Sequence, residues 1–83
     1  MTTRELQICK RILEILHDLD GGQANSLDIH AEIGGINFCS SGEFDAALAL
    51  LDRKKFVVGI KSKFKGVMWN ISDAGEAARL EMR

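Results

Sequence analysis

The chain has 83 residues, 46% hydrophobic and 28% charged, which suits one small domain over residues 1–83. Because it has neither a run of about 20 apolar residues nor the apolar segment of a signal peptide, we expect a cytoplasmic protein and no membrane span. The net charge of −1 hides an asymmetry, since residues 1–52 carry three basic and nine acidic residues, and residues 53–83 carry eight basic and three acidic ones. Such a positive pole is what a phosphate-rich partner surface requires.

The first predicted element is a helix over residues 4–19, with Thr2 and Glu5 placed as a capping box. Its apolar face covers close to half of the circumference, wider than the roughly 100° stripe that one core contact requires. Either the helix is buried between layers of its own fold, or one flank meets a second subunit, and in so small a chain we favour the second explanation. The sequence therefore predicts a homodimer whose interface includes Leu6, Cys9, Leu13 and Leu16.

Two further helices are predicted from their capping residues. Asn25 or Ser26 offers a side-chain oxygen to cap a second, shorter helix. A third helix over residues 41–54 begins where Ser40 or Ser41 can cap it, and carboxylates in its first turn complement the helix dipole. The short apolar segment between these two helices is expected to be a docked loop or a few residues of extended chain.

After the third helix, the spacing of apolar residues changes to two, which predicts an antiparallel hairpin with a turn at residues 62–66. We interpret Gly59 as a bulge and Trp69 as the hydrophobic plug of the hairpin. A final short helix is predicted over residues 74–82. The residues expected to alternate toward the core are Phe56, Val58 and Ile60 on the first strand and Val67, Trp69 and Ile71 on the second.

Six basic residues and no acidic one lie between residues 53 and 66. They fall at the start and the tip of the hairpin, where they contact phosphates or, alternatively, keep an edge strand from pairing with another sheet. Phe64 stands between Lys63 and Lys65 at the tip. Its ring either inserts into a partner or folds back over its own hairpin, and the frequency of isolated apolar residues on protein surfaces favours folding back.

Three helices followed by a two-stranded hairpin resemble the winged helix-turn-helix family. The segment from Phe44 to Val57 resembles the third helix and first wing strand of that family. The segment Trp69-Asn70-Ile71-Ser72-Asp73-Ala74-Gly75 resembles the aromatic-x-Leu-Thr-x-x-Gly ending of small MarR- and PadR-type regulators. The resemblance implies an α+β, mainly α fold, in which three helices are followed by a β-hairpin wing and a short C-terminal helix.

The same resemblance implies a DNA-binding protein, a transcription regulator or accessory factor of bacterial or phage type. In such proteins the third helix enters the major groove of double-stranded DNA and the basic wing touches its backbone. The residues then expected at the DNA are Ser40, Ser41, Arg53, Lys54, Lys55, Lys61, Lys63, Phe64 and Lys65.

The third helix departs from this pattern, because its first turns carry carboxylates and alanines where donors to bases are expected. The alternative interpretation is a winged-helix module that binds a protein and not DNA. A broad basic face would favour DNA, and an exposed acidic third helix beside the wing would favour the protein partner.

No catalytic, cofactor or metal site is predicted. The chain has no nucleophile in a recognisable elbow and no glycine-rich phosphate loop after a strand, so we expect neither enzyme activity nor a cofactor. The residues His17, His30, Cys9 and Cys39 lack the close spacing of zinc ligands. Both cysteines are expected to be buried or half-buried thiols of a protein kept in a reducing compartment.

Overall fold

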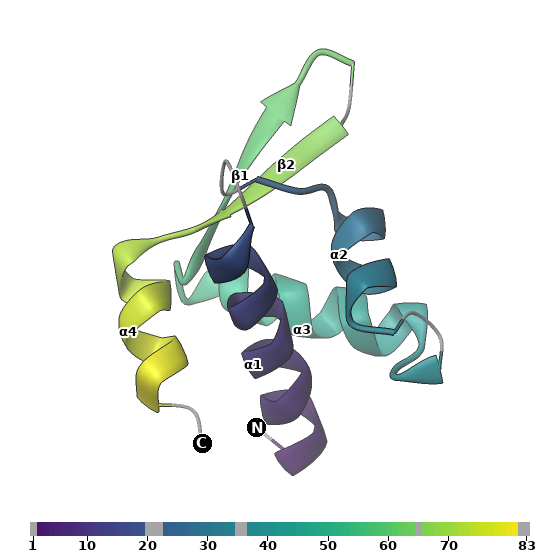
Figure 1. Cartoon of the computed structure of the whole chain (residues 1–83), viewed down its shortest axis with the longest axis vertical. Helices are drawn as coiled ribbons and strands as arrows, with labels where there is room; N and C mark the ends of the chain where they lie inside the picture. The colour runs from purple at the N-terminus through teal and green to yellow at the C-terminus, as the bar shows by residue number, and fades with distance from the viewer. Residues whose placement is uncertain (1, 20–22, 35–36, 65, 82–83) are drawn as a thin grey trace.

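The computed structural model describes residues 2–19, 23–34, 37–64 and 66–81. The fold is mainly helical, with one antiparallel hairpin, and this confirms the predicted order of elements (Figure 1). The predicted helix end at Met82 lies outside the described residues. The elements are α1 (Thr3–Asp18), α2 (Ser26–Glu32), α3 (Ser41–Arg53), β1 (Val57–Ser62), β2 (Gly66–Ile71) and α4 (Asp73–Glu81).

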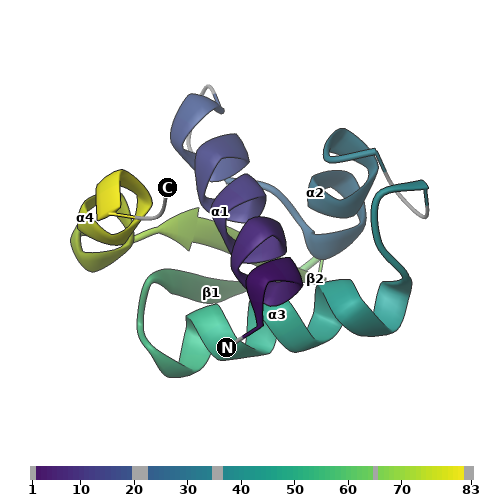
Figure 2. The same ribbon diagram turned by 90° about the horizontal axis from the view of Figure 1, so that it is seen from below.

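The helix α1 lies at the centre of the fold. It crosses α3 and lies between α2 and α4, and it also contacts β2 (Figure 2). Cys9, Leu13 and Leu16 are at most 1% exposed. The predicted dimer interface is therefore wrong for these three residues, because their wide apolar face is filled by elements of the same chain. Leu6 is half-buried.

Side-chain caps begin the first three helices. Thr2 Oγ1 accepts a hydrogen bond from the backbone N–H of Glu5 at 3.1 Å, and Asn25 accepts one from the first turn of α2 at 2.8 Å. Ser40 and Glu43 form a full capping box, in which each side chain accepts from the backbone N–H of the other, at 3.1 and 3.0 Å. These bonds satisfy N–H groups that have no partner within the helix.

The helix α3 ends in a left-handed turn at Lys55, whose φ is +62°. The backbone N–H of Lys55 donates to the carbonyl of Asp52 at 3.0 Å, and that of Phe56 donates to the carbonyl of Leu51 at 2.9 Å. This pair of bonds is the Schellman motif, in which glycine is the usual left-handed residue. The turn leads the chain into β1.

The hairpin turns the predicted residues of β2 toward the core but not the predicted residues of β1. Trp69 and Ile71 pack against the buried cluster, as predicted, and so does Phe56 before β1. Val57 is 1% exposed, whereas Val58 and Ile60 are 46% and 52% exposed. The prediction that Val58 and Ile60 face the core is therefore wrong. Directly opposed residues share one face of a sheet. On the face of Val57, the opposed pairs are Val57 with Ile71, Gly59 with Trp69, and Lys61 with Val67.

Gly59 makes room for an aromatic ring. A Cβ atom at this position would lie 2.9 Å from Cζ3 of Trp69 and 2.9 Å from Cγ1 of Val67. Because Gly59 also pairs in unbroken register with Trp69, the predicted bulge is wrong. The absence of a side chain at Gly59 is what lets the indole lie across β1.

Ala24 adds a contact to β2 that the sequence pattern did not predict. It forms an antiparallel bridge with Trp69, with backbone N–H···O bonds of 3.2 and 2.8 Å. The strand β2 thus has β1 on one edge and Ala24 on the other, and the stretch before α2 is tied to the hairpin.

Ser72 and Gly75 dock α4 onto the corner between α3 and β1. The Ser72 hydroxyl donates to the carbonyl of Lys55 at 2.6 Å and accepts from the backbone N–H of Gly75 at 3.0 Å. A Cβ atom at Gly75 would lie 2.0 Å from the carbonyl oxygen of Phe56. The Ser-x-x-Gly part of the quoted motif therefore serves close packing.

The buried residues form one apolar cluster drawn from all four helices, β1, and the segments that precede α2 and α3. Cys9 and Cys39 are both free and buried in it, as predicted. In the described ranges, no polar or charged residue is buried. Over the same ranges, no helix is both long and apolar enough to cross a membrane.

Candidate functional site

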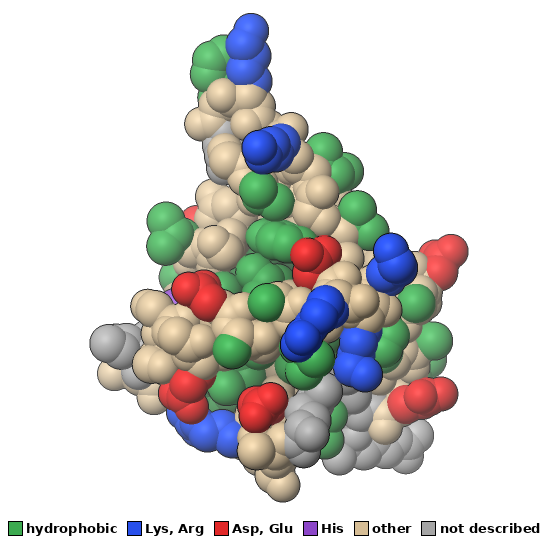
Figure 3. Space-filling model, turned by 180° about the vertical axis from the view of Figure 1, so that it is seen from behind, with side chains coloured by type: hydrophobic (Ala, Val, Ile, Leu, Met, Phe, Trp, Pro, Cys, Tyr) green, Lys and Arg blue, Asp and Glu red, His purple; other side chains and the backbone are tan. Residues whose placement is uncertain are grey.

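The end of the hairpin projects beyond the helices (Figures 1 and 3), and it carries an exposed aromatic ring. Phe64 is 89% exposed, and the Nζ atom of Lys63 lies 5.8 Å from the centre of its ring. The prediction that this ring folds back over its own hairpin is wrong. A large apolar side chain at the end of a protruding element is available to a partner.

The two described lysines of the hairpin have free charges. Lys61 and Lys63 are exposed. Among the described residues, Arg4 forms an ion pair with Glu43 and His17 contacts Glu76, and neither contact involves a hairpin lysine. Lys65, which the sequence also places at the tip, lies outside the described residues. The hairpin end is therefore a cationic surface with no internal neutralisation in the part that the structure describes.

The other residues predicted at DNA lie at the two ends of α3. Arg53, Lys54 and Lys55 are exposed at its C-terminal end. Ser40 and Ser41 are exposed at its N-terminal end, about 20 Å away along a 13-residue helix, and the Ser40 oxygen is already used in the cap. Figure 3 shows an acidic side chain between the basic groups on the hairpin and the basic groups on the body. The predicted residues thus do not form one continuous basic face.

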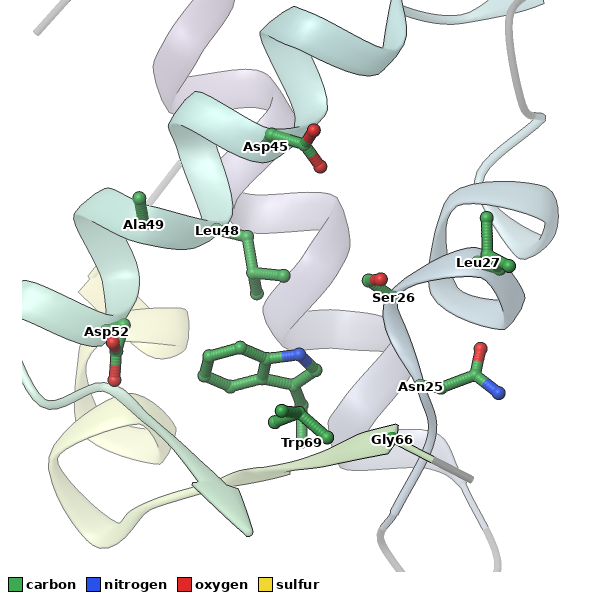
Figure 4. A pocket seen from close by; sticks show the side chains of 10 residues that line it. Asn25, Ser26, Leu27, Asp45, Leu48, Ala49, Asp52, Gly66 and Trp69 are labelled. Atoms are coloured by element: carbon green, nitrogen blue, oxygen red, sulfur yellow. The ribbon is translucent and has the colours of Figure 1, made fainter. Parts of the chain in front are cut away.

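A groove that the sequence analysis did not identify lies between α2, α3 and β2 (Figure 4). Its volume is about 490 Å³, within the roughly 300–1,000 Å³ range of ligand pockets. Leu48, Val67 and Trp69 supply apolar lining, and Asp45 and Asp52 line it from α3. The spacing of the two aspartates by two helical turns was the available signal in the sequence.

Trp69 occupies the middle of this groove, where Figure 4 shows its indole beside Leu48. The ring is half-buried and packs against the core, as a hairpin plug should, but one side remains open to the groove. Among the described residues, no hydrogen bond involves the indole N–H. Leu27, on the α2 side of the groove, is 79% exposed.

The N-terminal end of α3 is occupied by an internal ion pair. Arg4 Nε lies 2.5 Å from Glu43 Oε2, and Arg4 Nη2 donates to the carbonyl of Phe38 at 2.7 Å. The hydrogen bond from Arg4, followed by that from the Ser40 backbone, lowers the pKa of Glu43 to about 2. This carboxylate therefore stabilises the fold and is not free for a ligand.

The histidines and cysteines take part in packing. In the described ranges, no three His, Cys, Asp or Glu side chains are grouped so that they could hold a metal ion. His17 Nδ1 lies 2.8 Å from the Glu76 carboxylate, and the His30 ring stacks on Phe44 with 4.7 Å between ring centres. Burial raises the pKa of the Cys9 thiol to about 11, which keeps it protonated and unreactive at neutral pH.

Comparison of the chain with family models, with curated proteins and with solved structures finds no match. The structure itself offers two candidate functional surfaces. One is the cationic hairpin end with Phe64 at its tip, and the other is the acidic and apolar groove beside α3.

Proposed function

We propose that the protein is a winged-helix DNA-binding protein, a transcription regulator or accessory factor that holds the phosphate backbone through its hairpin. The order α1, α2, α3, β1, β2 supports this fold assignment, and so does the isolated antiparallel bridge of Ala24 to β2, on the edge of that strand opposite β1. The observation that carries the functional proposal is the protruding hairpin end, whose described lysines have no carboxylate partner within the described residues.

Phosphate contact by lysines gives an affinity that is largely independent of base sequence. Each phosphate neutralised releases condensed counterions and steepens the dependence of log affinity on log salt by about 0.9. Asp45 and Asp52 on the exposed face of α3 repel phosphates, so this helix contributes little to base reading. Phe64 supplies an apolar wedge that fits between base steps in a minor groove.

A titration of a DNA duplex across salt tests the proposal. Fluorescence anisotropy between 50 and 200 mM salt should give a linear plot of log affinity against log salt, and K63A should reduce its slope by about 0.9. The control is R11A, which removes an exposed cation from α1, outside the hairpin and α3, and should leave the slope unchanged. Absence of binding at 50 mM salt, or an unchanged slope in K63A, would contradict the proposal.

Protein binding is the second candidate function. The specific observation in its favour is that α3 presents two exposed aspartates beside the hairpin and an apolar groove between them and β2. A phosphate-binding face would not carry these charges, whereas a partner with cationic and apolar side chains would pair with them.

A further inference from the structure

We infer that the groove between α2, α3 and β2 receives the hairpin end of a second copy of this chain. The inference goes beyond the proposed DNA contact and does not depend on it. It joins two features that are exposed in the described parts of the chain: an acidic, apolar groove and a basic, aromatic tip.

The acidic side of the groove has a defined spacing. Asp45 and Asp52 both line it from α3, and both are exposed. Seven residues of helix separate them, so their Cα atoms are about 10.5 Å apart on one face. In the described ranges neither aspartate forms an ion pair, so both carboxylates are free to accept from an incoming cation.

The apolar part of the groove suits an aromatic ring. Leu48 and Trp69 lie side by side in it, and Leu27 stands exposed on the α2 side (Figure 4). The Trp69 ring offers the edge and face contacts that aromatic pairs prefer. Its N–H, for which the described residues provide no acceptor, can donate to a backbone carbonyl of an incoming segment.

The hairpin end has the matching chemistry. Phe64 is 89% exposed, and Lys63 and Lys65 flank it in the sequence. The Nζ atom of Lys63 lies 5.8 Å from the centre of the Phe64 ring, so the ring has a cation beside it. An aromatic ring with an adjacent cation complements an apolar floor beside two carboxylates.

The expected association is weak and reciprocal. One inserted ring buries about 150–250 Å² of its own surface, well below the roughly 1,200–2,000 Å² of a stable interface. A two-fold arrangement, in which each tip enters the groove of the other copy, doubles this contact and closes the assembly. Because the contact relies on charges near the surface, it weakens as salt screens them.

Sedimentation velocity from 10 µM to 1 mM protein measures this association. We expect a monomer–dimer equilibrium in 50 mM NaCl whose dissociation constant is at least tenfold higher in 500 mM NaCl. F64A should also raise the dissociation constant at least tenfold, and so should D52K. The matched control E81K makes the same charge change at an exposed position on α4 and should leave the dissociation constant unchanged.

A charge exchange identifies the contact itself. D52K and K63D should each self-associate poorly, because tip and groove then carry charges of the same sign within each variant. An equimolar mixture should form a heterodimer, because Lys63 of D52K meets Asp52 of K63D, and the new aspartate of K63D meets the new lysine of D52K. Failure of the mixture to associate would overturn the inference. A wild-type protein that is a monomer at 1 mM in 50 mM NaCl would also overturn the inference. If F64A and D52K both associate as strongly as the wild type, the dimer contact lies elsewhere and the inference is wrong.

Two further readouts separate other outcomes. Trp69 is the only tryptophan, so its fluorescence reports on the groove. If the protein without peptide is a monomer at 1 mM and a Lys-Phe-Lys peptide still changes that fluorescence, the groove serves a foreign basic partner and the inference is wrong. Groove variants such as D52K keep the hairpin intact, so their duplex binding should persist when self-association is lost. Failure of DNA binding is thus distinguishable from failure of the groove contact.

Discussion

Replacement of Gly75 by alanine tests the packing of α4 on the α3–β1 corner. The added Cβ would lie 2.0 Å from the carbonyl oxygen of Phe56 and 2.8 Å from Cγ1 of Ile71, well inside the ordinary contact distance of 3.4 Å. The nearest atom belongs to the backbone, so no side-chain rotation relieves the overlap. The helix must move away from β1, and that movement weakens the 2.6 Å bond from Ser72 to the Lys55 carbonyl.

The magnitude follows from two opposing effects. Overpacking at a site that cannot yield costs about 3 kcal/mol, and alanine in place of glycine within a helix returns up to about 1 kcal/mol. The expected net loss is therefore about 2 kcal/mol, a large part of the roughly 5 kcal/mol that a domain of this size has. With a urea m-value of about 1 kcal/mol/M, the midpoint of unfolding should fall by about 2 M.

Urea unfolding followed by Trp69 fluorescence and by circular dichroism measures this change. The matched control is G42A, because Gly42 is also helical and a Cβ there would meet only the Ser40 Oγ atom, at 4.0 Å. This control should unfold at the same or a higher urea concentration than the wild type, because alanine in a helix raises the free energy of unfolding by up to about 1 kcal/mol relative to glycine. A midpoint for G75A equal to that of the wild type would refute the proposed packing of α4.

Three other changes test separate parts of the fold. K55G should raise the free energy of unfolding by about 0.5–1 kcal/mol, measured by urea unfolding. A residue with a side chain loses about 1–2 kcal/mol in the left-handed conformation of Lys55, and glycine removes this cost. The greater chain entropy of glycine in the unfolded state offsets part of the gain. E43Q keeps the cap of α3 but loses the charge pair with Arg4. The pKa of Glu43 is lowered from 4.5 to about 2 in the folded protein. The difference in unfolding free energy between wild type and variant should therefore be present above pH 4.5 and disappear as the pH falls toward 2. A gap that stays constant over this window would contradict the role of the ion pair. Iodoacetamide at pH 8 should modify Cys9 only as the protein unfolds, because burial raises its pKa to about 11, and rapid modification of the native protein would show that the thiol is accessible.

The sequence predicted the helices well where capping chemistry is local. Asn25 and Ser40 were each recognised as potential caps from their position before an apolar pattern, and both serve as caps in the structure. The facing of β2 was predicted correctly, whereas that of β1 was wrong for Val58 and Ile60, because both alternating sets of β1 contain apolar residues. The outcome depends on Trp69, which needs the empty position at Gly59, and no period in the sequence encodes that contact between strands.

The candidate site was predicted in part. The lysines and Phe64 were recognised because a charge cluster is visible in the sequence. The groove depends on α2, α3 and β2 meeting in space, and the burial of α1 depends on all of its neighbours at once. For that reason the prediction that Cys9, Leu13 and Leu16 lie in a subunit interface was wrong: sequence spacing gives the width of a face but not what covers it.

The position of the hairpin end outside the packed body affects how this chain can change over generations. Residues 61–64 are not members of the buried cluster, and Lys61, Lys63 and Phe64 are exposed, so substitutions at these three positions are little constrained by the packing of the helices. Length and charge at the tip can drift, or be redesigned, while the scaffold stays intact. Residues of the hairpin end can thereby be selected for binding while residues of the buried cluster are selected for folding, within one short polypeptide.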